Sequence, residues 1–102
     1  MIHHTVHFWL KPETSAARRA EMLATLKRLA DSPNVTDCRV GKPAGTPREV
    51  VDNSYDLQLF TTFQDQAALD RYQSADDQRH MAFIEGFKDC WTRVLIYDSI
   101  EA

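Results

Sequence analysis

Two histidines and a tyrosine offer the clearest chemistry in this chain of 102 residues. His4, Tyr72 and His80 each share the apolar face of a predicted strand or helix, so the three side chains would point into one largely apolar pocket. The His80 imidazole, with an ordinary pKa of about 6.5, would accept a proton near neutral pH. The Tyr72 hydroxyl would hydrogen-bond a carbonyl or enolate oxygen. Together they would support enolisation, aldol closure or isomerisation of a small carbonyl compound without a cofactor.

The same side chains also have a purely structural interpretation. Polar atoms of half-buried residues are usually satisfied by the backbone or by water, and the spacing alone favours this interpretation over catalysis. An apolar pocket with a few convergent polar groups is nevertheless the usual form of a ligand site. Its predicted apolar lining consists of Val6, Phe8, Leu23, Leu26, Leu59, Phe83 and Trp91.

Metal and cofactor chemistry are not indicated by the sequence. His3 and His7 share one face of a predicted strand, but their Cα atoms would lie roughly 13 Å apart. A metal bound at about 2.1 Å from each ring nitrogen needs its ligands closer together, so we expect no metal site. Cys38 and Cys90 lack a partner motif and are expected to be unbridged, inert thiols. No haem, flavin or nicotinamide signature is present, so no cofactor is expected.

Charge and hydropathy exclude two further classes. The formal net charge is −3 and no segment concentrates Lys and Arg, which argues against a nucleic-acid partner. The longest apolar runs, such as residues 94–97, are far too short for a membrane span. The first residues show no secretory signal pattern. We therefore expect a single cytoplasmic domain covering residues 1–102.

Alternation and helical periodicity define the elements that must position the pocket. A strand over residues 2–11 would place His4, Val6 and Phe8 on one face and Thr5, His7 and Trp9 on the other. A helix capped at Thr14-Ser15 would end at residues 31–33. Its predicted apolar stripe consists of Ala16, Ala20, Leu23, Leu26 and Ala30.

The second half of the chain completes the pattern. Strands are predicted over residues 36–41, 55–63 and 91–100, with a Pro- and Gly-rich loop at 42–47. Asp65 would cap a short helix that carries Tyr72, and a second helix would follow the acids at 76–77. That second helix has the apolar stripe His80, Phe83, Ile84 and Phe87. The order β-α-β-β-α-β predicts an α+β, ferredoxin-like fold with a four-stranded antiparallel sheet and helices on one face.

Several of these segments, taken in order, resemble the stress-responsive A/B barrel (Dabb) family. The matching patterns are the opening His-x-Val-x-Phe-x-Leu-Lys strand at 4–11, Tyr55-Asp56-Leu57, Ala68-Leu69-x-x-Tyr72, His80-x-x-Phe83, Trp91 and the strand at 94–98. The resemblance implies a dimeric α+β barrel in which the helix-free sheet faces of two subunits pack together. The family includes plant stress proteins and a plant polyketide cyclase whose positions matching His4, Tyr72 and His80 serve its pocket.

The chain departs from the family pattern in two places. Seven residues separate Tyr72 from His80, where the family often has five. Leu57 stands where the cyclase carries a histidine. Both departures concern the pocket rather than the fold.

Three functions remain open at this level. The first is a homodimer that binds a small apolar or aromatic molecule, with Thr5, His7, Trp9, Gln58 and Phe60 buried against the second copy. The second is a cofactor-free cyclase, lyase or isomerase that uses His80 and Tyr72. The third is a cofactor-independent monooxygenase, in which the substrate itself activates oxygen.

Overall fold

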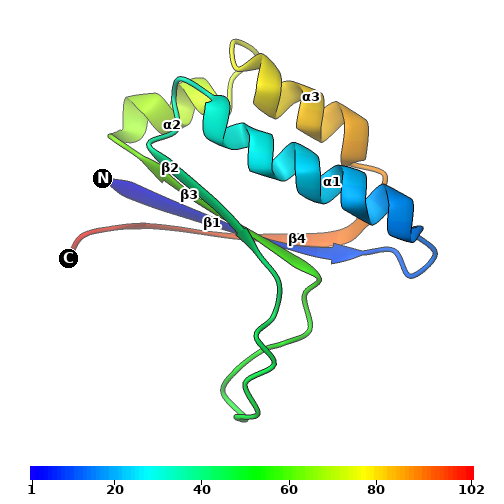
Figure 1. Cartoon of the computed structure of the whole chain (residues 1–102). Helices are drawn as coiled ribbons and strands as arrows, with labels where there is room; N and C mark the ends of the chain where they lie inside the picture. The colour runs from blue at the N-terminus through cyan, green and yellow to red at the C-terminus, as the bar shows by residue number, and fades with distance from the viewer.

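A four-stranded antiparallel sheet, covered on one face by helices, forms the framework of the protein (Figure 1). The computed structural model describes all 102 residues. The strands lie in the order β2-β3-β1-β4. Along the chain the elements are β1 (Ile2–Leu10), α1 (Ala16–Arg28), η1 (Leu29–Asp31), β2 (Asp37–Gly41), β3 (Leu57–Phe63), α2 (Gln66–Tyr72), α3 (Gln78–Phe87) and β4 (Trp91–Ile100). This arrangement confirms the predicted ferredoxin-like α+β fold.

Each α-helix begins at a residue whose side chain caps it. Ser15 accepts a hydrogen bond from the backbone N–H of Arg18, Asp65 from that of Ala68, and Asp77 from that of His80. Such caps satisfy N–H groups that the helix itself leaves without a partner. The caps predicted at Ser15 and Asp65 are therefore confirmed.

The predicted buried face of α1 was correct at Leu26 and wrong at its other positions. Ala16, Ala20 and Ala30 are exposed and Leu23 is only half-buried. The residues that α1 and η1 bury are Met22, Leu26 and Leu29. These three follow the same i, i+4, i+7 spacing but carry large side chains, so turning this face to the sheet removes more apolar area from water.

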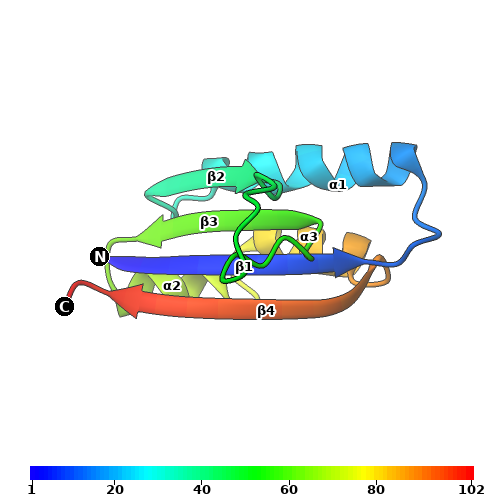
Figure 2. The ribbon, with the colours of Figure 1, turned by 90° about the horizontal axis from the view of Figure 1, so that it is seen from below.

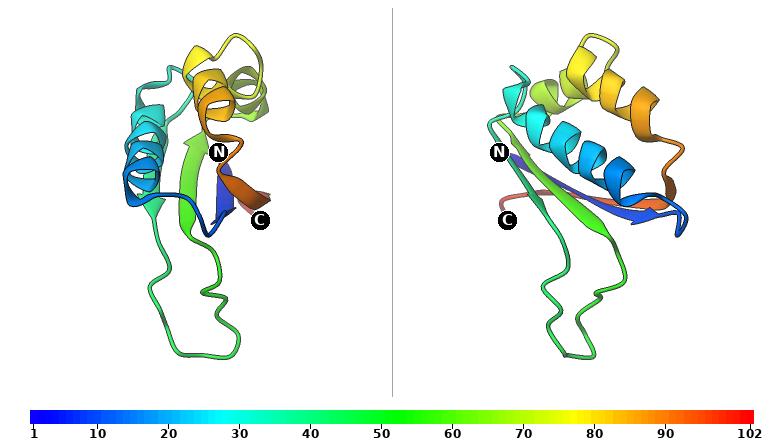
Figure 3. Two further views of the ribbon diagram at one scale, coloured as in Figure 1. Left: turned by 90° about the vertical axis from the view of Figure 1, so that its right-hand side faces the viewer. Right: turned by 45° about the vertical axis from the view of Figure 1, so that its right-hand side comes forward.

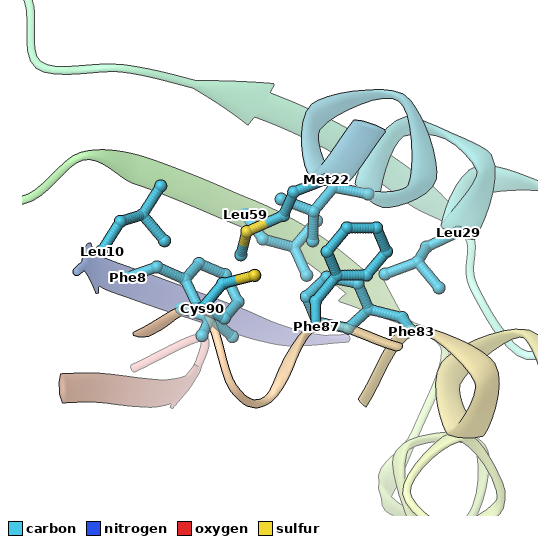
Figure 4. Packing of buried hydrophobic residues seen from close by; sticks show 10 residues of the cluster. Phe8, Leu10, Met22, Leu29, Leu59, Phe83, Phe87 and Cys90 are labelled. Carbon is cyan, nitrogen blue, oxygen red and sulfur yellow. The ribbon is translucent and has the colours of Figure 1, made fainter. Parts of the chain in front are cut away.

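The main core lies between the sheet and helices α1 and α3 (Figure 4). Phe8 of β1 and Leu59 of β3 meet Met22 from α1 and Phe83 from α3 in this core. A smaller cluster at the other end of the sheet consists of Ile2, Phe63, Ala68, Leu69 and Tyr72. Tyr72 thus ends α2 inside one cluster, while Phe83 of α3 belongs to the other.

The opposite face of the sheet carries no helix (Figure 2). Thr5 and His7 of β1 lie there beside Phe60 and Gln58 of β3 and beside Tyr97 and Leu95 of β4. Residues 42–56, which join β2 to β3, leave the sheet on this same side and project away from it (Figures 1 and 3). We call this segment the arm. It is two residues longer than the connection left between the predicted strands at 36–41 and 55–63, because β3 begins at Leu57 rather than at Tyr55.

None of the helices combines the length and the apolar character needed to cross a membrane.

Candidate functional site

A cavity of about 160 Å³ lies under α2 and α3, on the half of the sheet formed by β1 and β4. Nine of its 12 lining residues are hydrophobic, which makes it an apolar pocket with few polar groups. The lining residues are His4, Val6, Phe8, Leu59, Tyr72, Gln73, His80, Phe83, Ile84, Trp91, Val94 and Ile96. An apolar pocket into which a few polar groups converge is the usual form of a small-molecule site.

The structure brings together most of the residues singled out in the sequence. The cavity wall contains His4, Tyr72 and His80 together with Val6, Phe8, Leu59, Phe83 and Trp91. Leu23 and Leu26 do not reach it. Leu26 is fully buried in the main core, and Leu23 borders a separate depression with Val40 and Leu57. The reason is that α1 packs over β2, on the far half of the sheet from the cavity.

Tyr72 and His80 form the polar centre of the cavity. Their ring centroids lie 4.2 Å apart with an angle of 33° between the planes. The Tyr72 hydroxyl and the His80 Nδ1 atom are both buried, and neither has a hydrogen-bond partner. Leaving a buried polar atom unpaired costs about 1–3 kcal/mol. Both residues line the cavity, so these two unpaired atoms are suited to meet polar atoms of a guest molecule.

Burial sets the protonation state of this pair. It raises the pKa of Tyr72 far above its ordinary value, so the hydroxyl keeps its proton and serves as a hydrogen-bond donor. Burial also lowers the pKa of His80, an effect that the Asp77 carboxylate opposes and His4 reinforces. His80 is therefore neutral at pH 7 and offers one ring nitrogen as an acceptor. The pair presents a donor and an acceptor without a net charge.

His4 enters the cavity from the sheet, next to Tyr72. The two ring centroids lie 6.3 Å apart with the planes at 73°. The His4 Nδ1 atom is hydrogen-bonded to Oδ1 of Asp98, its direct cross-strand neighbour on β4. That bond holds the buried ring in one orientation and leaves Nε2 as the free nitrogen.

Asp98 is the polar residue of this site that the sequence did not reveal. It lies 94 residues from His4 along the chain, and the two meet only because β4 adds to the sheet beside β1. The alternation of Val94, Ile96 and Asp98 along the last strand, together with the register of β1 and β4, would have been the signal. Val94 and Ile96 join the cavity wall by the same alternation.

The connection between α2 and α3 positions His80 despite its extra length. Asp77 caps α3 through the backbone N–H of His80 at 3.0 Å. Its other oxygen accepts hydrogen bonds from Ser32 Oγ at 2.5 Å and from Asn34 Nδ2 at 3.0 Å. Burial alone would raise the pKa of Asp77, but these three hydrogen bonds outweigh it and lower the pKa. Asp77 therefore ties the start of α3, and with it His80, to the segment that follows η1.

Acidification is expected to destabilise the protein through His80. Its folded-state pKa lies below the ordinary value of about 6.5, so the unfolded chain binds a proton more readily than the folded protein does. Stability is then retained above about pH 6.5 and falls as the pH drops towards the folded-state pKa. Urea unfolding at about pH 7.5 and about pH 5.5 measures this difference.

A His80→Asn variant is the control for that experiment, because it keeps the other three histidines. The loss of stability between the two pH values should be smaller in the variant than in the wild type. An equal loss in both proteins would show that His80 does not contribute.

Two other predicted features have clear positions. Cys38 and Cys90 are both free, as expected. His3 and His7 lie on the helix-free face, where His3 contacts Thr62 and Glu101 and His7 contacts Gln58. No three His, Cys, Asp or Glu side chains lie close enough together to hold a metal ion.

Comparison with known proteins identifies related chains. Residues 2–101 match the model of the stress responsive A/B barrel domain. No curated protein matches the chain. A dimeric ferredoxin-like protein of unknown function from Jannaschia sp. is 26% identical, with a TM-score of 0.71 and 98% of each chain covered. A ferredoxin-like Dabb family protein from Mesorhizobium loti is 25% identical, with a TM-score of 0.78 over 99% of this chain and 96% of its own.

A third solved structure has a named activity. The hydroxynitrile lyase from Passiflora edulis superposes with a TM-score of 0.81, covering 99% of this chain and 93% of its own. Its sequence identity is 17%, so this likeness shows the shared fold.

Proposed function

The chain belongs to the stress-responsive A/B barrel domain family, and from this premise we propose that it is a homodimer. We propose further that it binds a small, uncharged, largely apolar or aromatic molecule in the cavity under α2 and α3. One observation carries the proposal. The Tyr72 hydroxyl and His80 Nδ1 are buried without partners in a cavity wall whose other residues, apart from His4 and Gln73, are apolar. A guest with one hydroxyl or carbonyl group would satisfy them, while its hydrocarbon part would contact Phe8, Phe83 and Trp91.

The cavity volume limits the size of this molecule. A volume of about 160 Å³ is close to that of an engineered protein cavity of about 150 Å³ that binds benzene. The part of the ligand that the cavity holds is therefore a single ring or a chain of similar size. Neutral His80 and protonated Tyr72 favour an uncharged polar group over a carboxylate or an ammonium ion.

Phenol and toluene are a matched pair of probes for this site, because they differ only by a hydroxyl in place of a methyl group. A Tyr72→Phe variant is expected to bind phenol about 10-fold more weakly, since one hydrogen bond is lost. Toluene affinity should stay unchanged. The free energy of unfolding of the variant should also be about 1 kcal/mol higher than that of the wild type, because the variant lacks the unpaired buried hydroxyl. Isothermal titration and urea unfolding measure the two quantities.

The result that contradicts this assignment is also clear. Equal affinities of phenol for the wild type and the Tyr72→Phe variant would show that Tyr72 does not meet the guest. A loss of stability in the variant would show that its hydroxyl already has a partner in the folded protein.

Acid–base catalysis on the bound molecule is the second candidate. Three groups that can accept, donate or stabilise a proton converge on one cavity, and His4 is backed by the Asp98 carboxylate. Neutral His80 would take a proton from a substrate hydroxyl while Tyr72 hydrogen-bonds the same oxygen. Cyanohydrin cleavage suits these groups: the hydroxyl proton moves to His80, the carbonyl forms, and cyanide leaves with the electron pair of the broken C–C bond. Hydroxynitrile lyase activity in a protein of this fold guides the choice of this test reaction.

The homodimer is supported by the helix-free face. This face carries the aromatic side chains of Trp9, Phe60 and Tyr97, and Tyr97 is 61% exposed. Aromatic side chains of this kind are enriched at protein interfaces. A solved structure that is 26% identical to this chain is a dimeric ferredoxin-like protein. The second copy would cover the face that no helix covers.

A further inference from the structure

The arm is held firmly at its root. Trp9 Nε1 donates a hydrogen bond to Ser54 Oγ at 3.1 Å, and the backbone N–H of Asp56 donates to the carbonyl of Phe8 at 2.8 Å. Tyr55 packs edge-on against His7, with ring centroids 4.9 Å apart. These contacts join the end of the arm to β1 and determine the direction in which it leaves the sheet.

The outer part of the arm is braced only within itself. Val51 N–H donates to the Arg48 carbonyl at 3.0 Å, and Asn53 Nδ2 donates to the Thr46 carbonyl at 3.0 Å. Residues 44–50 are all exposed, and Val50 at 81% is the most exposed large hydrophobic side chain of the protein. Val50 is flanked there by the exposed Arg48, Glu49 and Asp52, so the outer arm carries one exposed large apolar side chain among charged ones. The arm projects from the helix-free side of the sheet, which places it where a second copy would cover that face (Figure 1).

The area of the sheet face indicates why a dimer would need the arm. The four strands hold 9, 5, 7 and 10 residues, which at about 3.3 Å per residue and about 4.8 Å between strands cover roughly 490 Å² per subunit. Two such faces bury roughly 1,000 Å² in total, below the roughly 1,200 Å² at which stable interfaces begin. Obligate homodimers bury 2,000 Å² or more as a rule. The 15 residues of the arm are the surface on this side that can supply the difference.

We propose that the arm clasps the second copy of this chain, so that each subunit of a two-fold dimer buries the exposed Val50 side chain of its own arm against its partner. Packed sheets lie about 10 Å apart, whereas half of the arm reaches at most about 23 Å. An arm rooted beside the interface is therefore long enough to extend past the partner's sheet, and it projects from the side of the sheet that carries no helix (Figures 1 and 3). The proposal rests on the homodimer proposed above and assigns much of its affinity to the arm.

Two variants test the clasp. Val50→Asp replaces the exposed apolar side chain of the arm by a charged one, and replacement of residues 44–51 by Asn-Gly removes the outer part of the arm while keeping the root at Ser54 and Asp56. Ala24→Asp, on the exposed side of α1, adds the same charge elsewhere. Sedimentation equilibrium should show a dimer dissociation constant raised about 100-fold or more for the two arm variants and unchanged for Ala24→Asp. Circular dichroism and cooperative urea unfolding check that all three remain folded.

The outcomes separate the clasp from the dimer itself. A wild-type dimer whose arm variants dimerise with unchanged affinity would overturn the clasp and leave the homodimer in place. A wild-type monomer at about 100 µM would overturn both. Hydrogen exchange offers a second measurement that needs no variant. The amides of Arg48 and Val51 should exchange more slowly in the dimer than in protein diluted to monomer, and equal rates would also overturn the clasp.

Discussion

Replacement of Asp77 by alanine is expected to lower the free energy of unfolding by roughly 2–4 kcal/mol. The change removes the cap of α3, which is worth about 1 kcal/mol. It also leaves Ser32 Oγ, in a residue that is 3% exposed, and Asn34 Nδ2 without their acceptor, at a cost of about 1–3 kcal/mol. Urea unfolding measures the loss. Phenol affinity should fall as well, because the first turn of α3 carries His80.

Asp65→Ala is the matched control for this change. Asp65 caps α2 in the same way, through the backbone N–H of Ala68, but it is exposed and holds no other side chain. Its replacement should cost only about 1 kcal/mol and leave phenol affinity nearly unchanged. Equal losses from the two alanine variants would show that the bonds to Ser32 and Asn34 contribute nothing beyond the cap.

Cleavage of acetone cyanohydrin is expected to separate the two candidate functions. This substrate has six non-hydrogen atoms and so matches the benzene-sized cavity. If His80 is the base, a His80→Ala variant should lose turnover by about 10²–10⁴-fold, while toluene binding stays nearly intact. Release of cyanide, corrected for the uncatalysed reaction, measures turnover. A Lys88→Ala variant, altered on the exposed surface at the end of α3, is the control and should keep the wild-type rate.

Two results would decide against catalysis by this pair. No turnover above background in the wild type, together with phenol binding that depends on Tyr72, would support a binding protein without this chemistry. Turnover that survives in His80→Ala would assign the base to another group, of which His4 with its Asp98 partner is the next candidate in the cavity. Asp98→Asn would then be the variant that distinguishes them.

The sequence by itself determined the elements and much of the candidate site. Alternation along residues 2–11 was sufficient to put His4, Val6 and Phe8 on the face that lines the cavity. The stripe that contains His80 and Phe83 likewise faces the cavity. These inferences succeed because strand alternation, helical period and capping are local: each depends on residues within a few positions along the chain.

Tertiary structure decided what local patterns cannot express. The face of α1 was mispredicted apart from Leu26. Two stripes at helical spacing pass through Leu26, one with alanines and Leu23 and one with the larger Met22 and Leu29, and only packing against the sheet selects between them. Leu23 and Leu26 were assigned to the pocket because they lie on the predicted stripe, but α1 packs on the far half of the sheet.

The polar contacts of the site also depend on tertiary structure. The hydrogen bond of His4 to Asp98 depends on the register of β1 and β4, which come from opposite ends of the chain. The orientation of His80 depends on Ser32 and Asn34, whose contact with Asp77 exists only once α3 has packed beside η1.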